Sequence, residues 1–208
     1  LGGGEARCGL ACKTGDAPSR LERFVGKRFK GGRMGPIRGG NLFIEGPIKR
    51  TYGDGIILVG DAAGQTKPTT GGGVILGGIC AIEAGRTAAD ALKRGDPNSS
   101  LLRRYQESWR KILGREFSQM LAIRRVFERL SDQQIDRIFK TVKEEDWIMD
   151  LLLSQLKKAD MDMQSGLIGQ ILREPRITKI LLKSLGSLAA EEIMRRLNFK
   201  INLKGDSS

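Results

Sequence analysis

The sequence predicts an α/β first part followed by an all-α second part. Of its 28 glycines, 23 fall within residues 1–95, where they indicate tight turns and close backbone contacts. The remainder is rich in Leu, Ile, Arg, Lys, Glu and Gln, most of which favour helices. The turn sequence at residues 95–98 separates the two parts. In the first part, the apolar run at residues 56–59 precedes a glycine-rich loop and a helical pattern, which together indicate a strand, a loop and a helix.

The composition excludes several kinds of catalytic and metal site. The 208 residues include no histidine, which removes Ser/His/Asp triads, Cys/His dyads and most zinc or iron sites. Three cysteines are too few for a disulfide scaffold, so a reduced, cytoplasmic setting is expected. Cys8 and Cys12 have no further ligand residues after them, and we expect no metal site. No stretch approaches the roughly 20 apolar residues that a membrane span needs.

The net charge of +12 predicts attraction to polyanions. It is spread evenly, since residues 1–98 and 99–208 each carry +6. Nucleic acid is not an expected partner, because no lysine or arginine run forms a cluster and aromatic residues make up only 5%. The charge instead suits an anionic membrane surface, with the protein lying peripherally on it, or it serves solubility alone.

Three patterns describe the first part up to residue 50. Glu5 to Cys12 alternates with a period of two, which predicts a half-buried strand. Residues 19–29 predict a short amphipathic helix with Leu21, Phe24 and Val25 on its apolar side. Residues 39–49 have the composition of strand and turn.

The second part has strong helix signals. Asn98, Ser99 or Ser100 is a suitable cap for a long helix whose apolar residues step by three and four as far as Leu130. Ser131–Gln134 is a capping box that begins the next helix. Trp109 and Trp147 fit these apolar stripes and are expected in the core. Further helices are predicted at residues 146–157, 163–173, 176–185 and 188–198, with Pro175 between two of them.

The segment from Ile56 to Leu92 carries the chemistry. Asp61 follows the predicted buried strand, where a carboxylate is well placed to accept hydrogen bonds from ligand hydroxyls. A helix predicted from Val74 to Lys93 begins after three glycines, and its free amides and dipole favour negative charge. Small residues allow a ligand to approach the backbone, and Pro68 stiffens the loop. Within the helix, seven small residues predict close packing on a sheet: Gly77, Gly78, Ala81, Ala84, Gly85, Ala88 and Ala89.

Two known nucleotide-binding patterns do not fit this segment. A phosphate-binding P-loop fails, because the fifth residue after Gly60 is Gln65 and not glycine. The dinucleotide pattern Gly-x-Gly-x-x-Gly is not cleanly present. A strand, loop and helix with glycines for packing alone remains open. Cys80 is expected to be a buried structural thiol.

The residues Gly60-Asp61-Ala62-Ala63-Gly64, then Pro68, Gly71-Gly72-Gly73-Val74 and Gly85-Arg86-Thr87-Ala88-Ala89 resemble a flavin-binding motif. It is the second such motif of the geranylgeranyl reductase family, within the FAD-dependent, p-hydroxybenzoate-hydroxylase-like α/β class. The resemblance implies that Asp61 binds FAD hydroxyls and that Gly73 and Val74 bring helix amides to the flavin. The cofactor-binding residues it implies are Gly60, Asp61, Ala62, Pro68, Gly72, Gly73 and Val74.

The resemblance extends over nearly the whole chain. It covers residues 1–10, residues 17–24, and residues 105–110 with the helices after them. It implies a reductase that saturates C=C bonds of geranylgeranyl chains in isoprenoid lipids, supplied with electrons by a nicotinamide cofactor or ferredoxin. It does not identify a catalytic proton donor.

The family's first dinucleotide motif is missing, so a C-terminal fragment is expected, inactive by itself. Its parts would be partial substrate-domain strands and a short helix at 1–50, the C-terminal part of the FAD-binding domain at 51–95, and a helical region at 96–208. Two alternatives remain: a non-enzymatic basic helical binding module, and a related flavin monooxygenase or halogenase.

Overall fold

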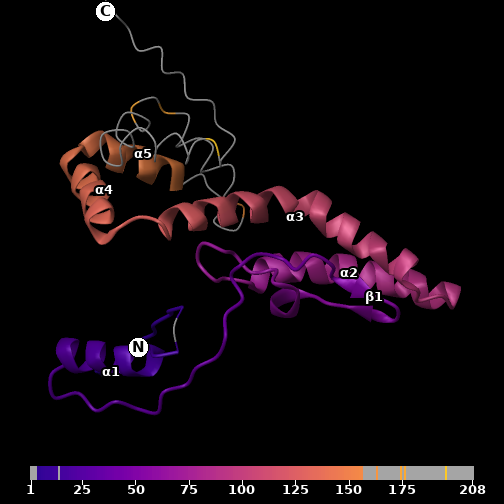
Figure 1. Ribbon diagram of the computed structural model, residues 1–208, viewed down its shortest axis with the longest axis horizontal. Coiled ribbons are helices and arrows are strands. Elements are labelled where there is room, and N and C mark those ends of the chain that lie inside the picture. The colour runs from indigo at the N-terminus through magenta and orange to yellow at the C-terminus, as the bar shows by residue number, and fades with distance from the viewer. Residues whose placement is uncertain are drawn as a thin grey trace, which may run out of the picture. The chain divides into compact units, whose positions relative to one another are not determined.

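The structure, a computed structural model, describes residues 4–13 and 15–156, together with Met163, Glu174, Arg176 and Arg195. The chain divides into two compact units, Leu1–Asn41 and Leu42–Ser208. The described part is mostly helical, with one small two-stranded sheet (Figure 1). The three-part division at residues 50 and 95 stays a prediction.

The first unit contains helix α1, Ala17–Arg28, which was predicted at residues 19–29. Pro18 lies in its first turn, where the missing amide of proline costs no hydrogen bond. The strand predicted from Glu5 to Cys12 was wrong, because these residues have no regular structure and are mostly exposed. Alternation of apolar residues gives a strand one apolar face, but a strand forms only where another strand pairs with it.

The second unit begins with an extended segment and a short β-hairpin. Strand β1, Tyr52–Gly53, pairs antiparallel with strand β2, Ile56–Ile57, and Gly55 takes a φ of +68° in the turn. The buried strand predicted at residues 56–59 is therefore shorter than expected, and Ile56 is 53% exposed because only one neighbouring strand pairs with it. The strand and turn expected at residues 39–49 were wrong, because this segment has no regular structure apart from bends at Glu45 and Lys49.

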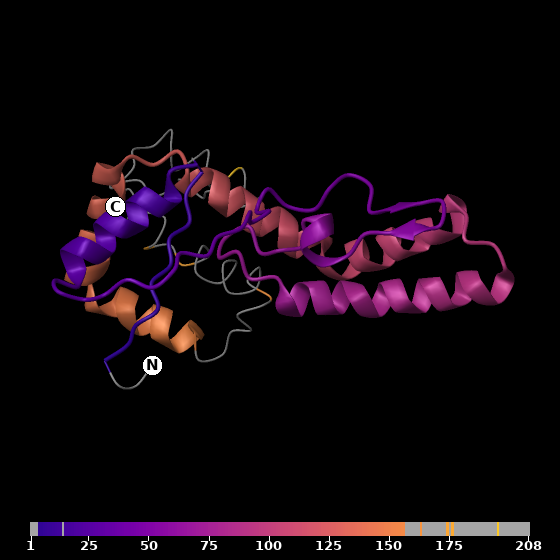
Figure 2. The same cartoon turned by 90° about the horizontal axis from the view of Figure 1, so that it is seen from below.

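Two long helices form the body of this unit. Helix α2 spans Val74–Arg94 and helix α3 spans Ser99–Phe127, which confirms the predicted start of each. Gly95 ends α2 in the left-handed conformation, with a φ of +64°. The two helices lie side by side, and the β-hairpin lies along α3 (Figure 2).

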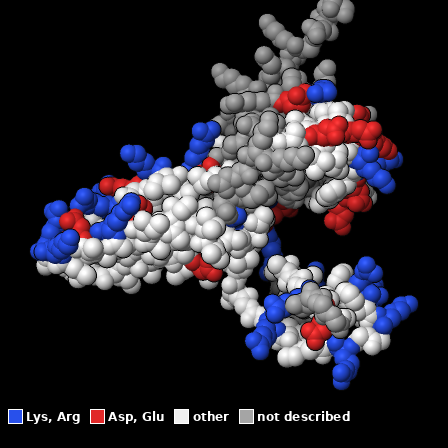
Figure 3. Space-filling model, turned by 180° about the vertical axis from the view of Figure 1, so that it is seen from behind, with Lys and Arg blue, Asp and Glu red and all other residues white. Residues whose placement is uncertain are grey.

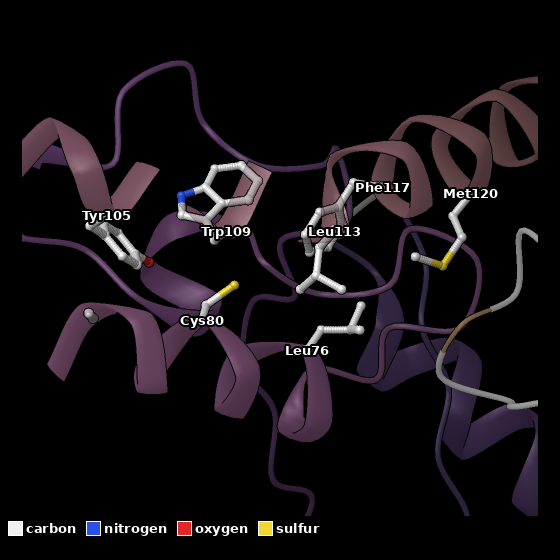
Figure 4. Packing of buried hydrophobic residues seen from close by; sticks show 8 residues of the cluster. Leu76, Cys80, Tyr105, Trp109, Leu113, Phe117 and Met120 are labelled. Carbon is white, nitrogen blue, oxygen red and sulfur yellow. The ribbon is translucent and has the colours of Figure 1, made fainter. Parts of the chain in front are cut away.

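The core lies between α2 and α3 (Figure 4). From α2, Leu76 and Cys80 point toward α3 and are fully buried. Trp109 of α3 is buried as predicted, and its ring meets Phe117 edge-on with centroids 6.0 Å apart. The remaining members of the cluster are Ala84, Tyr105, Leu113 and Met120.

The opposite side of α2 corrects the prediction made for its small residues. Its small residues were expected to pack on a sheet, but in the described residues α2 packs on α3 and on the turn at Gly60–Ala63. Ile82 is 58% exposed and Leu92 is 74% exposed, and Gly78 and Gly85 have no atom near the position of a β-carbon. Helical spacing therefore leaves one stripe of α2 uncovered among the described residues: Ile75, Gly78, Ile82, Gly85, Ala89 and Leu92.

Helices α4, Asp132–Glu144, and α5, Asp146–Leu156, follow. The predicted capping box is present, since Ser131 and Gln134 each accept a backbone hydrogen bond from the other. The helix predicted at 146–157 is confirmed as α5. The helices predicted at 163–173, 176–185 and 188–198, and Pro175, lie outside the described residues. Among the residues described, no helix has the length and apolar character needed to cross a membrane.

Candidate functional site

A tight turn presents Asp61. It is a short 3-10 helix, η1, at Gly60–Ala63. Gly60 begins this helix and Gly64 follows it, and both have positive φ values, of +65° and +67°. A β-carbon on Gly64 would lie 2.5 Å from the carbonyl oxygen of Gly46, so only glycine fits here. The Asp61 side chain is exposed at this turn.

The turn brings Asp61 to the start of α2. A β-carbon on Gly73 would lie 2.9 Å from Asp61 Oδ1 and 2.8 Å from Thr66 Cγ2. No side chain caps α2, no acidic residue lies in its first turn, and Val74 is 88% exposed. Because first-turn amides have no acceptor within a helix, this end presents donors beside a carboxylate. The arrangement suits a ligand that carries both hydroxyl groups and an anionic or carbonyl edge.

The loop between the turn and α2 is closed by its own backbone. Lys67 donates from its amide to the Gly72 carbonyl at 2.8 Å and accepts from the Gly71 amide at 2.8 Å. Pro68 is fully buried, and its carbonyl accepts from Arg124 Nη1 at 3.2 Å. Pro68 and Gly72 therefore shape the loop that sets the position of Gly73, as the sequence predicted for a stiff glycine-rich loop.

A buried network holds the turn in place and was missed from the sequence. Gln65 Oε1 accepts from the Gly60 amide at 2.8 Å, and its Nε2 donates to the Tyr105 hydroxyl at 2.9 Å. Tyr105 in turn donates to the carbonyl of Leu58 at 2.9 Å. In the sequence, Tyr105 fits an apolar stripe and the segment that resembles the geranylgeranyl reductase family, and neither assigns it a hydrogen bond. The one available signal was a polar residue, Gln65, directly after the glycine turn.

A second network anchors the segment before the hairpin to α3. The Thr51 amide donates to Gln106 Oε1 at 2.8 Å, and Trp109 Nε1 donates to Thr51 Oγ1 at 3.0 Å. The carbonyl of Thr51 accepts from the Leu58 amide at 2.9 Å. Helix α3 therefore supports the turn at Gly60–Ala63 from both sides of the hairpin.

Two titratable side chains of the core, Cys80 and Tyr105, keep their protons at ordinary pH. Burial raises the pKa of the Cys80 thiol to about 12, and Glu83 adds to this effect. Burial also raises the pKa of the Tyr105 hydroxyl to about 12, although its hydrogen bond with Gln65 acts the other way. Cys80 is thus the buried structural thiol that its sequence position predicted.

The structure brings most of the predicted site residues to one place. Gly60, Asp61 and Ala62 form the turn, while Gly73 and Val74 form the start of α2 that Asp61 faces. A side chain at Gly73 would displace Asp61, so the glycine allows the carboxylate to lie beside the start of α2.

Comparison with known proteins adds an independent finding. The chain is 36% identical over 150 residues to digeranylgeranylglycerophospholipid reductase 2 of Methanothermobacter thermautotrophicus, covering 70% of this chain and 38% of that protein. It is 35% identical over 138 residues to digeranylgeranylglycerophospholipid reductase of Methanothrix thermoacetophila, covering 66% of this chain and 35% of that protein. No protein-family model matches the chain. No solved structure matches it.

These relatives are reductases, and the chain is therefore related to that class of enzyme. More narrowly, the chain belongs to the geranylgeranyl reductase family. The chain spans little more than a third of the length of these curated relatives.

Proposed function

We propose that this chain supplies part of the FAD site of a reductase that saturates C=C bonds in the geranylgeranyl chains of isoprenoid membrane lipids. The single observation that carries the proposal is the juxtaposition of Asp61 with the uncapped start of α2 at Gly73. A carboxylate and a row of amides match a cofactor that has ribityl hydroxyls next to an electron-accepting ring.

Seven residues are proposed to bind the cofactor. Asp61 would accept from flavin hydroxyls, and the amides of Gly73 and Val74 would face the ring edge that gains negative charge. The others shape the backbone around these three: Gly60, Ala62, Pro68 and Gly72. When bound, a reduced flavin supplies a hydride to one carbon of the C=C bond, and the other carbon takes a proton.

The chain's own residues narrow the search for the proton donor. Cys80 and Tyr105 are fully buried in the core, and each has a pKa raised to about 12. Neither is therefore proposed as the acid. The nicotinamide cofactor or ferredoxin that would reduce the flavin is likewise proposed as a partner.

A surface groove favours an apolar, chain-like substrate. Its volume is about 450 Å³, and Pro47, Trp109, Phe117 and Leu121 are among the residues that line it. Gly114 of α3 also lines the groove. Such a groove along α3 is proposed to form part of the wall that holds an isoprenoid chain. The relatives are named for action on a digeranylgeranylglycerophospholipid, which agrees with this substrate class.

The cofactor proposal is tested by flavin content. The complete protein is expected to purify with the visible absorbance of a flavin, or to take up added FAD. Asp61→Ala is expected to lose most of it, while Asp136→Ala, on an exposed part of α4, is the matched control. A complete protein that stays colourless and binds no added FAD would overturn the proposal.

The activity is tested on lipids. With a reduced flavin, the complete protein should add two hydrogens to each C=C bond that it saturates in a geranylgeranyl lipid, as detected by mass spectrometry. Flotation with vesicles tests a peripheral position at the membrane, because a protein carrying +12 should prefer anionic to neutral lipid. Equal binding to both would contradict the membrane proposal alone.

The two alternatives from the sequence are weighed by the same results. The relatives described here are named reductases, which favours a reductase over a monooxygenase or halogenase. A basic binding module without enzymatic activity would bind no flavin in the first experiment.

A further inference from the structure

A largely buried arginine in the last turn of α3 contacts two segments that surround the turn at Gly60–Ala63. Arg124 Nη1 donates to the carbonyl oxygen of Pro68 at 3.2 Å. Its Nη2 lies 2.7 Å from Glu128 Oε1 and 3.9 Å from Glu45 Oε1. Pro68 belongs to the loop before α2, and Glu45 belongs to the extended segment before the hairpin. One guanidinium group therefore joins the end of α3 to both segments.

Both segments set the backbone of the candidate site. Before the turn, the Ile48 amide donates to the carbonyl of Ala63 at 3.0 Å, and Gly64 packs closely against the carbonyl of Gly46. After the turn, the loop at residues 67–72 is closed by its own backbone hydrogen bonds and leads directly to the start of α2. A side chain that holds both segments against α3 therefore fixes the backbone on both sides of η1.

Stability alone does not explain why this arginine is buried. The side chain of Arg124 is only 14% exposed, and its Nε is buried with no hydrogen-bond partner among the described residues. Loss of hydration offsets much of the attraction in a buried ion pair, and a buried donor without an acceptor adds to that cost. Arg125, exposed in the same last turn, interacts with the helix C-terminus without this cost. The burial of Arg124 is better explained by what its two Nη atoms hold.

We propose that Arg124 is a positioning residue of the cofactor site, because it holds the loop of Pro68 against α3 and so fixes where Asp61 meets Gly73. The inference rests on the proposed function, since the cofactor is the flavin proposed above. A lysine would replace this arginine only in part. Its ammonium group is a compact charge, whereas the planar guanidinium group reaches a carbonyl and a carboxylate at the same time.

The first experiment follows amide hydrogen exchange in the complete protein prepared without flavin. The amides of Lys67 and Gly71 donate to carbonyls of the loop, so their exchange reports whether the loop keeps its conformation. Arg124→Met removes the guanidinium group and keeps an unbranched apolar side chain. Arg125→Met makes the same change at the next residue of α3, where the side chain is exposed, and is the matched control.

We expect exchange in the loop at residues 67–72 to become about tenfold faster in Arg124→Met, because the loop has lost a hydrogen bond from a charged donor. Arg125→Met should match the wild type, and Arg124→Lys should recover part of the difference. A global loss of stability would speed exchange in the buried part of α2 as well. Exchange in the loop like that of the wild type, or a rise no larger than the rise in α2, would overturn the inference.

The second experiment measures the dissociation constant for added FAD. Arg124→Met should weaken binding about tenfold, the effect expected for one such lost hydrogen bond, while Arg125→Met leaves it unchanged. A faster loop with unchanged FAD binding would overturn the positioning role alone. A wild-type protein that binds no FAD would overturn the proposed function and this role with it. If Arg124→Met fails to fold, Arg124→Lys makes both comparisons, and wild-type values in that variant would overturn the inference.

Discussion

Helices α3 and α2 differ at their first residues. At the start of α3, Asn98 Oδ1 accepts from the Leu101 amide at 3.0 Å, and Asp54 Oδ1 accepts from the Ser99 amide at 2.6 Å. At the start of α2, glycines replace the capping residue and no side chain caps the helix. The two helix starts therefore differ in how far side chains satisfy them. The capped end stabilises the fold, while the start of α2 lacks a side-chain cap, and we propose that its amides are donors for the cofactor.

Charged side chains are concentrated near the start of α3. Lys and Arg side chains gather at the end of the unit where α2 ends and α3 begins (Figure 3). There Asp90 accepts from Arg94 at 3.0 Å and from Arg104 at 2.8 Å, and these bonds lower the pKa of Asp90. Such exposed ion pairs contribute little stability individually. They do show that charges at this end are paired with one another.

The largest effect is expected from a substitution at the start of α2. Gly73→Ala places a β-carbon 2.9 Å from Asp61 Oδ1, so the carboxylate must move away from the helix amides. We expect flavin binding by the complete protein to weaken at least tenfold, measured as a dissociation constant for FAD. Asn98→Ala replaces the residue at the corresponding position before α3 and should leave that constant unchanged. Equal losses in both variants would remove the distinction between the two helix starts.

The second effect concerns how α3 supports the turn. Gln65→Ala leaves the partly buried Gly60 amide without its acceptor and Tyr105 with one partner fewer. We expect a loss of about 1–3 kcal/mol in the free energy of unfolding, measured by denaturant titration. Ser118→Ala removes an exposed side-chain hydrogen bond on α3 and should cost less than about 0.5 kcal/mol. A change of that small size for Gln65→Ala would contradict the supporting role of the network.

The third effect measures the cap of α3 directly. Asn98→Ala removes the acceptor of the Leu101 amide and should destabilise the protein by about 1 kcal/mol. Asn98→Asp keeps an oxygen in place and should recover most of this stability. Thermal unfolding followed by circular dichroism provides the measurement, and a variant as stable as the wild type would show that the cap is dispensable.

The fourth substitution is expected to raise the stability of the protein, whereas the second and third lower it. Gly78 lies within α2 on the uncovered stripe, and a β-carbon there would meet no atom within 4 Å. Gly78→Ala should therefore stabilise the helix by roughly 0.5–1 kcal/mol, because alanine loses less backbone entropy on folding. The measurement is the denaturation midpoint of the complete protein. Destabilisation there would show that another surface covers this stripe closely.

The smallest effect is a pH dependence at the start of α3. The hydrogen bond from the Ser99 amide lowers the pKa of Asp54 below the ordinary value of an aspartate, 3.8. A carboxyl whose pKa is lower in the folded state stabilises the protein above pH 3.8 and loses this contribution as the pH falls through the folded pKa. Asp54→Asn should therefore flatten the acid limb of stability against pH below about pH 4. An unchanged slope would show that the bond carries no net free energy.

Local signals predicted the helices well. Glycines on both sides defined α2 to within one residue at its end, and Asn98 and Ser131 correctly marked the starts of α3 and α4. These signals work because caps and breakers act on neighbouring residues.

Long-range features could not be predicted in the same way. The alternation from Glu5 to Cys12 indicated an apolar face but not whether a partner strand was present, so the predicted strand was wrong. The small residues of α2 showed that something could approach closely, but not on which side. The hydrogen bond between Gln65 and Tyr105 joins residues that are 40 positions apart, a distance at which a single sequence carries no pairing signal.

That separation has a consequence for synthesis of the protein. A ribosome that has just completed the turn at Gly60–Ala63 has not yet made Tyr105, Gln106 or Trp109, whose side chains hold the turn and its hairpin. The backbone of this turn therefore reaches its final conformation only after α3 has emerged as far as Trp109 and packed. Translation stalled before α3 would yield a nascent chain that contains every glycine of the site but lacks the residues that shape it.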